Sequence, residues 1–138
     1  MISRIRAASE ADEMAVTTLW RACNLTVPYN DPAADFRFAR GKPASDILIA
    51  MEGEQLTGSI MVGHDGHRGW LYYIAVDPAR RRQGIGRTLV QAAERWLSDR
   101  GVPKAQLMVR ETNASVVEFY ARMGYDPMPR VNMQKWLK

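Results

Sequence analysis

At the centre of this chain stands the stretch Trp70-Leu71-Tyr72-Tyr73-Ile74-Ala75-Val76-Asp77-Pro78-Ala79-Arg80-Arg81-Arg82-Gln83-Gly84-Ile85-Gly86. Its first seven residues are aromatic or aliphatic, so they predict a β-strand over 70–76, which Asp77-Pro78 ends. Apolar residues then recur at helical spacing over 86–100, which predicts an amphipathic helix. The stretch is therefore a strand that passes through a glycine-containing turn into a helix.

This turn has the chemistry of an anion site. The first N–H groups of a helix lack partners, and the helix dipole favours negative charge there. Gly84 and Gly86 let a phosphate approach the backbone, and the neighbouring arginines offer charge-assisted hydrogen bonds. The Lys-Ser/Thr pair of a P-loop is missing, as are the third glycine and the βαβ repeat of a Rossmann site. A plain turn beside solvated arginines remains the alternative.

The rest of the chain mixes strands with helices. Apolar runs predict strands, and apolar residues at helical spacing predict helices. The strands are expected over 2–7, 47–51, 55–62, 105–109 and 131–137, and the helices over 10–23, from Pro32 to about Gly41, and over 114–123. Ser9 with Asp12, and Asp31 before Pro32, are typical of helix N-termini. The order of elements favours an α/β or α+β fold with a mostly antiparallel sheet.

The composition is typical of one globular domain. The 138 residues have room for a single core, with 46% apolar and 25% charged residues. We expect no membrane contact, because no apolar run approaches about 20 residues and no signal peptide is recognisable. The single cysteine, Cys23, excludes an internal disulfide and a cysteine-rich metal site, and favours the cytoplasm. We expect no nucleic-acid partner, because no aromatic residues interleave with the basic cluster formed by Arg80, Arg81, Arg82 and Arg87.

Three motifs, in register over nearly the whole chain, resemble one known family. The GNAT superfamily of N-acetyltransferases carries an Arg/Gln-x-x-Gly-x-Gly/Ala motif, which Arg81-Arg82-Gln83-Gly84-Ile85-Gly86 resembles. The segment Tyr73-Ile74-Ala75-Val76-Asp77-Pro78 before it is similar to the family's fourth strand. Downstream, the family's asparagine and its Phe-Tyr-x-x-x-Gly-Tyr/Phe signature resemble Asn113, Phe119-Tyr120 and Met123-Gly124-Tyr125. Residues 64–73 are most similar to the YpeA-like branch.

The resemblance implies a fold and a co-substrate. The expected fold is a single N-acetyltransferase domain over residues 1–138, with a mixed, mostly antiparallel sheet of six or seven strands and about four helices. The fourth and fifth strands are expected to splay apart, and acetyl-CoA enters there. The residues that the resemblance places at coenzyme A are Ile74, Ala75, Val76, Arg81, Arg82, Gln83, Gly84, Ile85, Gly86, Arg87, Thr88, Asn113 and Phe119.

For the chemistry, the resemblance points to Tyr120. Attack of an amine on the thioester releases a thiolate, which a well-placed phenol can protonate; packing of the ring against the sheet is the alternative. Asn113 either binds pantetheine or caps the last helix. Ribosomal-protein alanine acetyltransferases carry a glutamate at the position of Met108, and this departure weakens an inference of protein N-terminal acetylation. Glu111 is expected to face elsewhere, so no general base is assigned.

The resemblance implies that the first two helices and their linker build the acceptor pocket. Its candidate residues are Trp20, Tyr29, Asp31 and Tyr72. Trp20 can equally be a core residue, and Asp31 a helix cap. Cys23 is expected to be a small buried apolar residue without a paired base, so we expect no thiol nucleophile and no acyl-enzyme. The expected reaction is direct acetyl transfer to an amine of a small molecule or peptide in a ternary complex. A non-catalytic acyl-CoA-binding module is the alternative, and the strand over 131–137 can pair with a second chain to form a homodimer.

Overall fold

The computed structural model describes residues 4–110 and 112–138. The chain forms two compact units, Met1–Met108 and Val109–Lys138, and each is considered by itself. Ile2 and Ser3, part of the predicted first strand, lie outside the described residues, as does Glu111. No helix among the described residues is long and apolar enough to cross a membrane.

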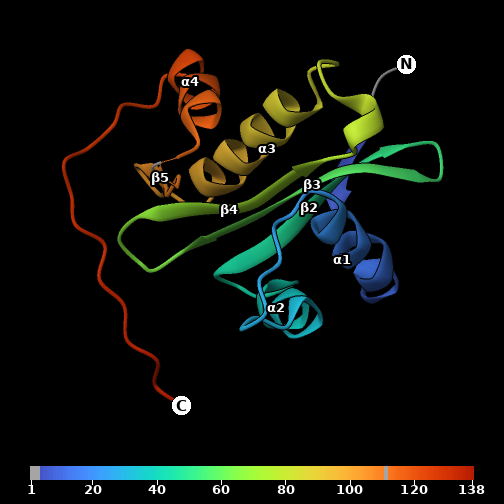
Figure 1. Ribbon diagram of the computed structural model, residues 1–138, viewed down its shortest axis with the longest axis horizontal. Coiled ribbons are helices and arrows are strands. Elements are labelled where there is room, and N and C mark those ends of the chain that lie inside the picture. The colour runs from blue at the N-terminus through green and yellow to red at the C-terminus, as the bar shows by residue number, and fades with distance from the viewer. Residues whose placement is uncertain (1–3, 111) are drawn as a thin grey trace. The chain divides into compact units, whose positions relative to one another are not determined.

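The first unit is built on one sheet (Figure 1). Within the described residues its strands, in spatial as well as chain order, are β1 (Arg4–Ala7), β2 (Ser45–Glu52), β3 (Gln55–His64), β4 (Gly69–Val76) and β5 (Ala105–Leu107). The first three pairings are antiparallel, and β4 pairs with β5 in parallel. The mixed, mostly antiparallel architecture is confirmed. The predicted strand number of six or seven is wrong, because five strands are present in the described part of the chain.

Helices cover both faces of this sheet (Figure 1). On one face lie α1 (Glu13–Ala22), which a 3₁₀ turn precedes at Glu10–Asp12, and α2 (Pro32–Ala39). Their buried residues, including Trp20 and Phe36, form a core with the inward side chains of β2 and β4. On the other face, α3 (Ile85–Asp99) approaches β3 so closely that a Cβ on Gly58 would lie 2.8 Å from Leu89.

The predicted helix starts are confirmed. The Ser9 N–H donates to the Asp12 carboxylate at 2.7 Å, in the manner of a capping box. Asp31 Oδ1 accepts from the N–H groups of Ala33 and Ala34 at 3.0 and 3.3 Å, directly before Pro32 at the first helical position of α2. These local contacts set the entry of α1 and α2 onto the sheet.

Strand β4 is irregular at its middle. Ala75 pairs with Ser59 and Tyr72 with Met61, so two residues of β4 face one residue of β3, which is a β-bulge. Tyr73 lies in this bulge with a φ of 50°, a left-handed conformation that is rare for an aromatic residue. Tyr72, opposite Met61, and Tyr73, stacked on Trp20, therefore both point to the face that α1 and α2 cover.

Strand β5 pairs with only the first part of β4. The parallel register joins Gly69 to Ala105 and Leu71 to Leu107, and β4 continues to Val76 beyond it. Over 72–76, β4 pairs with β3 alone within the described structure. This is the splay that was predicted between the fourth and fifth strands.

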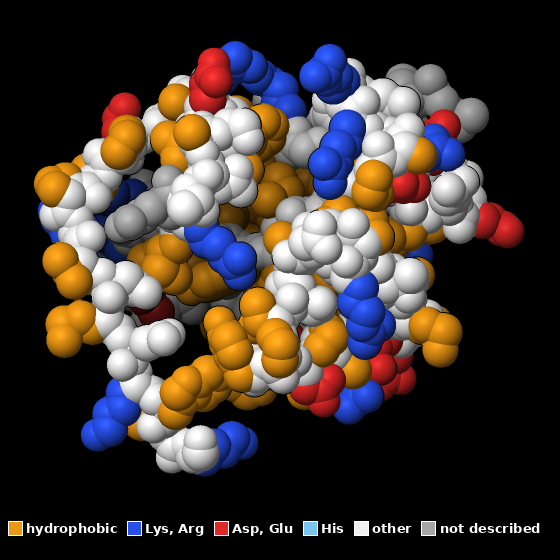
Figure 2. All heavy atoms as spheres, in the orientation of Figure 1, with side chains coloured by type: hydrophobic (Ala, Val, Ile, Leu, Met, Phe, Trp, Pro, Cys, Tyr) orange, Lys and Arg blue, Asp and Glu red, His pale blue; other side chains and the backbone are white. Residues whose placement is uncertain are grey.

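The second unit contains α4 (Ala114–Arg122), and Gly124, two residues beyond its end, has a φ of 94°. The strand predicted over 131–137 is wrong, because residues 125–138 form neither helix nor strand. Alternating apolar residues predicted a strand there, but a strand also needs a hydrogen-bonded neighbour. Apolar side chains along this segment are exposed instead (Figure 2), among them Val131, Met133 and Leu137. The homodimer that this strand suggested stays a prediction.

Candidate active site

The N-terminus of α3 is built around Gly84. This residue occupies the N-cap position with a φ of 81°, which glycine adopts without steric cost. The first helical hydrogen bond runs from the Thr88 N–H to the Gly84 carbonyl at 3.0 Å, so the N–H groups of residues 84–87 have no partner within the helix. A Cβ on Gly84 would meet no atom within 4 Å, so the space beside these donors is open. The turn presents backbone donors at the positive end of the α3 dipole.

The basic cluster divides into two parts. Arg80 is occupied, because its guanidinium pairs with Glu52 and donates to Gln55 Oε1 at 3.1 Å. Arg81, Arg82 and Arg87 are exposed, and no carboxylate among the described residues forms an ion pair with them. Arg82 also has a left-handed φ of 68°, close to Gly84. Three uncompensated cations therefore flank the free N–H groups of α3.

The other predicted residues of the first unit lie along β4 and α3. Ile74 and Val76 are half-buried and Ala75 is buried, and all three belong to the part of β4 beyond the β5 pairing. That part leaves one backbone edge without a strand partner in the described structure. Gln83 is exposed in the turn, Gly86 is half-buried, and Ile85 is buried and anchors the helix start. The Thr88 hydroxyl donates to the Gly84 carbonyl at 2.9 Å, so its proton is already used.

The face of β4 that α1 and α2 cover carries a polar cluster that the sequence did not predict. The Tyr73 hydroxyl donates to Asp35 Oδ2 at 2.9 Å, joining β4 to α2. The Tyr73 ring stacks on Trp20, with centroids 4.3 Å apart and planes 9° from parallel. Burial and the hydrogen bond to Asp35 raise the pKa of Tyr73 to about 12, while Asn30 acts in the opposite direction. Asp35 follows Asp31 by one helical turn, and no sequence pattern separates their roles.

The predicted acceptor residues have unequal access to solvent. Trp20 is fully buried, and its Nε1–H donates to Ser59 Oγ at 3.1 Å, so it supports the site from the core. Asp31 is engaged as the α2 cap. Tyr29 is 70% exposed and Tyr72 is 41% exposed, so these two retain surface for a ligand. Partial burial and the nearby charge of Asp65 raise the pKa of Tyr72.

Three predicted residues belong to the second unit. Asn113 occupies the N-cap position of α4, but its side chain makes no capping hydrogen bond with the described residues and instead accepts from Ser115 Oγ at 3.3 Å. Asn113 therefore stands at the cap position of α4, without a side-chain capping bond to the described residues. Tyr120 is buried and makes edge-on contacts with Phe119 and Tyr125, at centroid distances of 5.0 and 5.5 Å. Burial raises the pKa of Tyr120 to about 12, so its phenol stays protonated.

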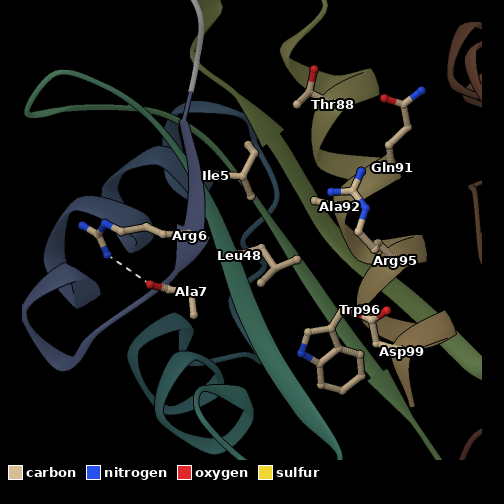
Figure 3. A pocket seen from close by; sticks show the side chains of 10 residues that line it. All are labelled: Ile5, Arg6, Ala7, Leu48, Thr88, Gln91, Ala92, Arg95, Trp96 and Asp99. Carbon is tan, nitrogen blue, oxygen red and sulfur yellow. Dashed lines mark hydrogen bonds between the residues drawn. The ribbon is translucent and has the colours of Figure 1, made fainter. Parts of the chain in front are cut away.

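A groove of about 290 Å³ lies elsewhere on the first unit, between β1, β2 and α3 (Figure 3). Ile5 and Leu48 face Ala92 and Trp96 across it, and Thr88 lies at one end. Thr88 is the single predicted coenzyme residue that lines this groove. The groove therefore does not coincide with the predicted coenzyme site.

The sequence profile of the acetyltransferase (GNAT) family matches residues 14–125, which include all of α1 except its first residue and the whole of α2, β2 to β5, α3 and α4. The chain belongs to the GNAT acetyltransferase family. The predicted superfamily and the predicted enzyme class, an N-acetyltransferase, are confirmed. Members of this GNAT family use acetyl-CoA as co-substrate. The assignment to the YpeA-like branch stays a prediction.

This chain is also similar to known acetyltransferases over most of its length. It is 38% identical over 133 residues to an acetyltransferase of Pectobacterium atrosepticum, covering 96% of this chain and 94% of that protein. AAC(6')-Iy, solved with the bisubstrate analogue CoA-S-monomethyl-acetylneamine, has a TM-score of 0.85 at 18% identity, with 99% of each chain covered. The ribosomal-protein-S18-alanine N-acetyltransferase of Escherichia coli has a TM-score of 0.76 at 23% identity, covering 89% of this chain and 77% of that one. At these identities the two structures establish the fold alone.

Proposed function

We propose that the protein transfers the acetyl group of acetyl-CoA directly to an amine of a small molecule or peptide. The observation that carries this proposal is the N-terminus of α3, where four unpaired N–H groups meet three arginines without ion-pair partners among the described residues. Such a site suits a diphosphate, because backbone donors, the helix dipole and guanidinium groups all favour negative charge. The profile match spans parts of both units, which supports a single catalytic domain.

The residues of this chain fit coenzyme A in two places. Gly84 and the following N–H groups would hold the pyrophosphate, with Arg81, Arg82 and Arg87 beside it. The unpaired edge of β4 at residues 74–76 would hydrogen-bond the amides of pantetheine as a neighbouring strand does. Acetyl-CoA supplies an activated acyl thioester there.

For the transfer, Tyr120 would donate a proton to the departing thiolate. Its phenol has a pKa of about 12 and so carries the proton that this role requires at neutral pH. An acyl-enzyme route is disfavoured, since the Cys23 thiol donates to the Val76 carbonyl at 3.3 Å and no histidine partner for it is present in the described structure. The amine must reach the thioester in its neutral form.

Steady-state release of coenzyme A tests the proposal, with acetyl-CoA and a panel of mono- and diamines. Gly84→Ala places a side chain at a φ of 81° beside the predicted phosphate site, and we expect a KM for acetyl-CoA about tenfold higher. Gly53→Ala is the matched control, because Gly53 has a φ of 63° and open space but lies in the β2–β3 turn. Both variants should lose about 1 kcal/mol of stability, and Gly53→Ala should keep its KM.

The outcomes separate the proposal from its alternative. Amine-dependent release of coenzyme A, with the KM effect confined to Gly84→Ala, supports direct acetyl transfer. Tight acetyl-CoA binding in calorimetry without turnover of any amine would instead favour a non-catalytic acyl-CoA-binding module. Equal KM values in both glycine variants would remove the α3 turn from the coenzyme site.

A further inference from the structure

The Asp35 carboxylate can accept more hydrogen bonds than the one that the structure shows. It is half-buried on α2 and accepts the Tyr73 hydroxyl proton at 2.9 Å. No Lys or Arg among the described residues lies within ion-pair distance of it. A carboxylate has about four acceptor positions, so this hydrogen bond leaves most of them available. A partly buried negative charge without a counter-ion is costly, and binding a cation would relieve that cost.

Tyr73, which donates the hydrogen bond to Asp35, has an unusual backbone conformation. Its φ of 50° in the β4 bulge is a conformation that persists only where surrounding contacts enforce it. The stacking on Trp20, which is fully buried, fixes the ring. The hydroxyl stays protonated, since the pKa of Tyr73 is about 12, and so it remains a donor to Asp35. Tyr73 therefore orients the Asp35 carboxylate from a fixed position.

The surroundings of the Tyr73–Asp35 pair suit an organic cation. Asn30 lowers the pKa of Tyr73 and Tyr29 raises it, so the segment before α2 lies near this pair. Tyr29 is 70% exposed, and Tyr72, on the same face of β4, is 41% exposed. Aromatic faces near a carboxylate attract ammonium groups through cation–π interactions.

We propose that Asp35 binds a second, non-reacting ammonium group of the acceptor, which makes di- and polyamines the preferred substrates. The inference rests on the proposed function, because it concerns the acceptor of that transfer. The reacting nitrogen must be neutral to attack the thioester, and a carboxylate in contact with it would raise its pKa and keep it protonated. Asp35 therefore serves the transfer best when it holds a different amino group of the same molecule. Asp35 is a specificity residue, and Tyr73 is its positioning residue.

A comparison of paired acceptors tests this. The probes are α,ω-diamines of three to six carbons, each matched with the amino alcohol in which one amine is replaced by a hydroxyl. The wild-type protein should prefer at least one diamine over its amino alcohol by about tenfold or more in kcat/KM. In Asp35→Asn this ratio should fall to near one, with the KM for acetyl-CoA unchanged. Tyr73→Phe, which keeps the stacked ring, should lower the ratio by a few-fold.

Glu10→Gln removes one carboxylate whose side chain is 93% exposed, and it should leave the ratio unchanged. Asp35→Glu should keep a preference for the diamine, which a purely structural role of Asp35 does not require. Turnover of amines with the same ratio in wild type and Asp35→Asn would overturn this inference and leave the proposed function standing. Absence of turnover with every amine would contradict the proposed function, and the inference with it.

Discussion

Tyr120 combines a buried phenol with a position in a family signature, and its protonation gives a test at the scale of one residue. We expect Tyr120→Phe to lower kcat about 100-fold or more, with the KM for acetyl-CoA nearly unchanged, because a general acid acts in the transition state. Tyr125→Phe is the control, since Tyr125 also contacts the Tyr120 ring but is assigned no chemical role. A kcat that is equal in Tyr120→Phe and wild type would exclude the acid role.

The pKa of Tyr120 also fixes a pH dependence. Burial raises this pKa from 10 to about 12, so the phenol is protonated, and able to donate, below about pH 11. Activity should therefore rise with pH as the amine becomes neutral, and Tyr120 should cause no alkaline loss of kcat between pH 7 and 10. A wild-type kcat profile that falls between pH 8 and 10 and becomes flat in Tyr120→Phe would contradict a raised pKa.

At the scale of the element, variants at the start of α2 can distinguish two roles of Asp31, which are helix capping and acceptor binding. Its Oδ1 accepts from two backbone N–H groups, so Asp31→Ala should lower the free energy of unfolding by about 1 kcal/mol. Asp31→Asn keeps an acceptor and should change it by only a few tenths. Urea denaturation measures both. An Asp31→Asn variant of normal stability but with a raised KM for amines would show that Asp31 binds the acceptor rather than only capping the helix.

Local signals in the sequence predicted most elements, because caps, turns and periodicity act over a few residues. The capped start of α2 and the amphipathic α3 are examples. The β4 bulge and the Tyr73–Asp35 hydrogen bond were not predictable, since each depends on which residues of a distant segment lie opposite. The strand expected over 131–137 failed for a related reason. Alternation shows that a segment can form a strand, but not that a partner strand is available.

At the scale of the whole molecule, the predicted site also divides into a local part and a part that depends on tertiary structure. The glycine turn was predictable because its residues are contiguous, whereas the proposed acceptor face draws on the segment before α2, on α2 and on β4. Asp31 was named from the sequence and Asp35 was not, although both carboxylates lie on the same short helix or at its start. Their different partners follow from tertiary packing, in which α2 brings Asp35 to Tyr73.

Acid unfolding tests a contact that joins β1 to the 3₁₀ turn before α1. Asp12 accepts from both terminal nitrogens of Arg6, at 2.8 and 3.2 Å, and these hydrogen bonds with those from Ser9 lower its pKa from 3.8 to about 2. Because the folded pKa lies below the unfolded one, the stabilisation is complete above about pH 5 and is lost as the pH falls towards 2. Asp12→Asn should be less stable at pH 7 and should lose stability less steeply between pH 4 and 2. Glu10→Gln, which alters a carboxylate that is 93% exposed, should retain the wild-type slope; equal slopes in wild type and Asp12→Asn would show that Asp12 does not contribute to the acid limb.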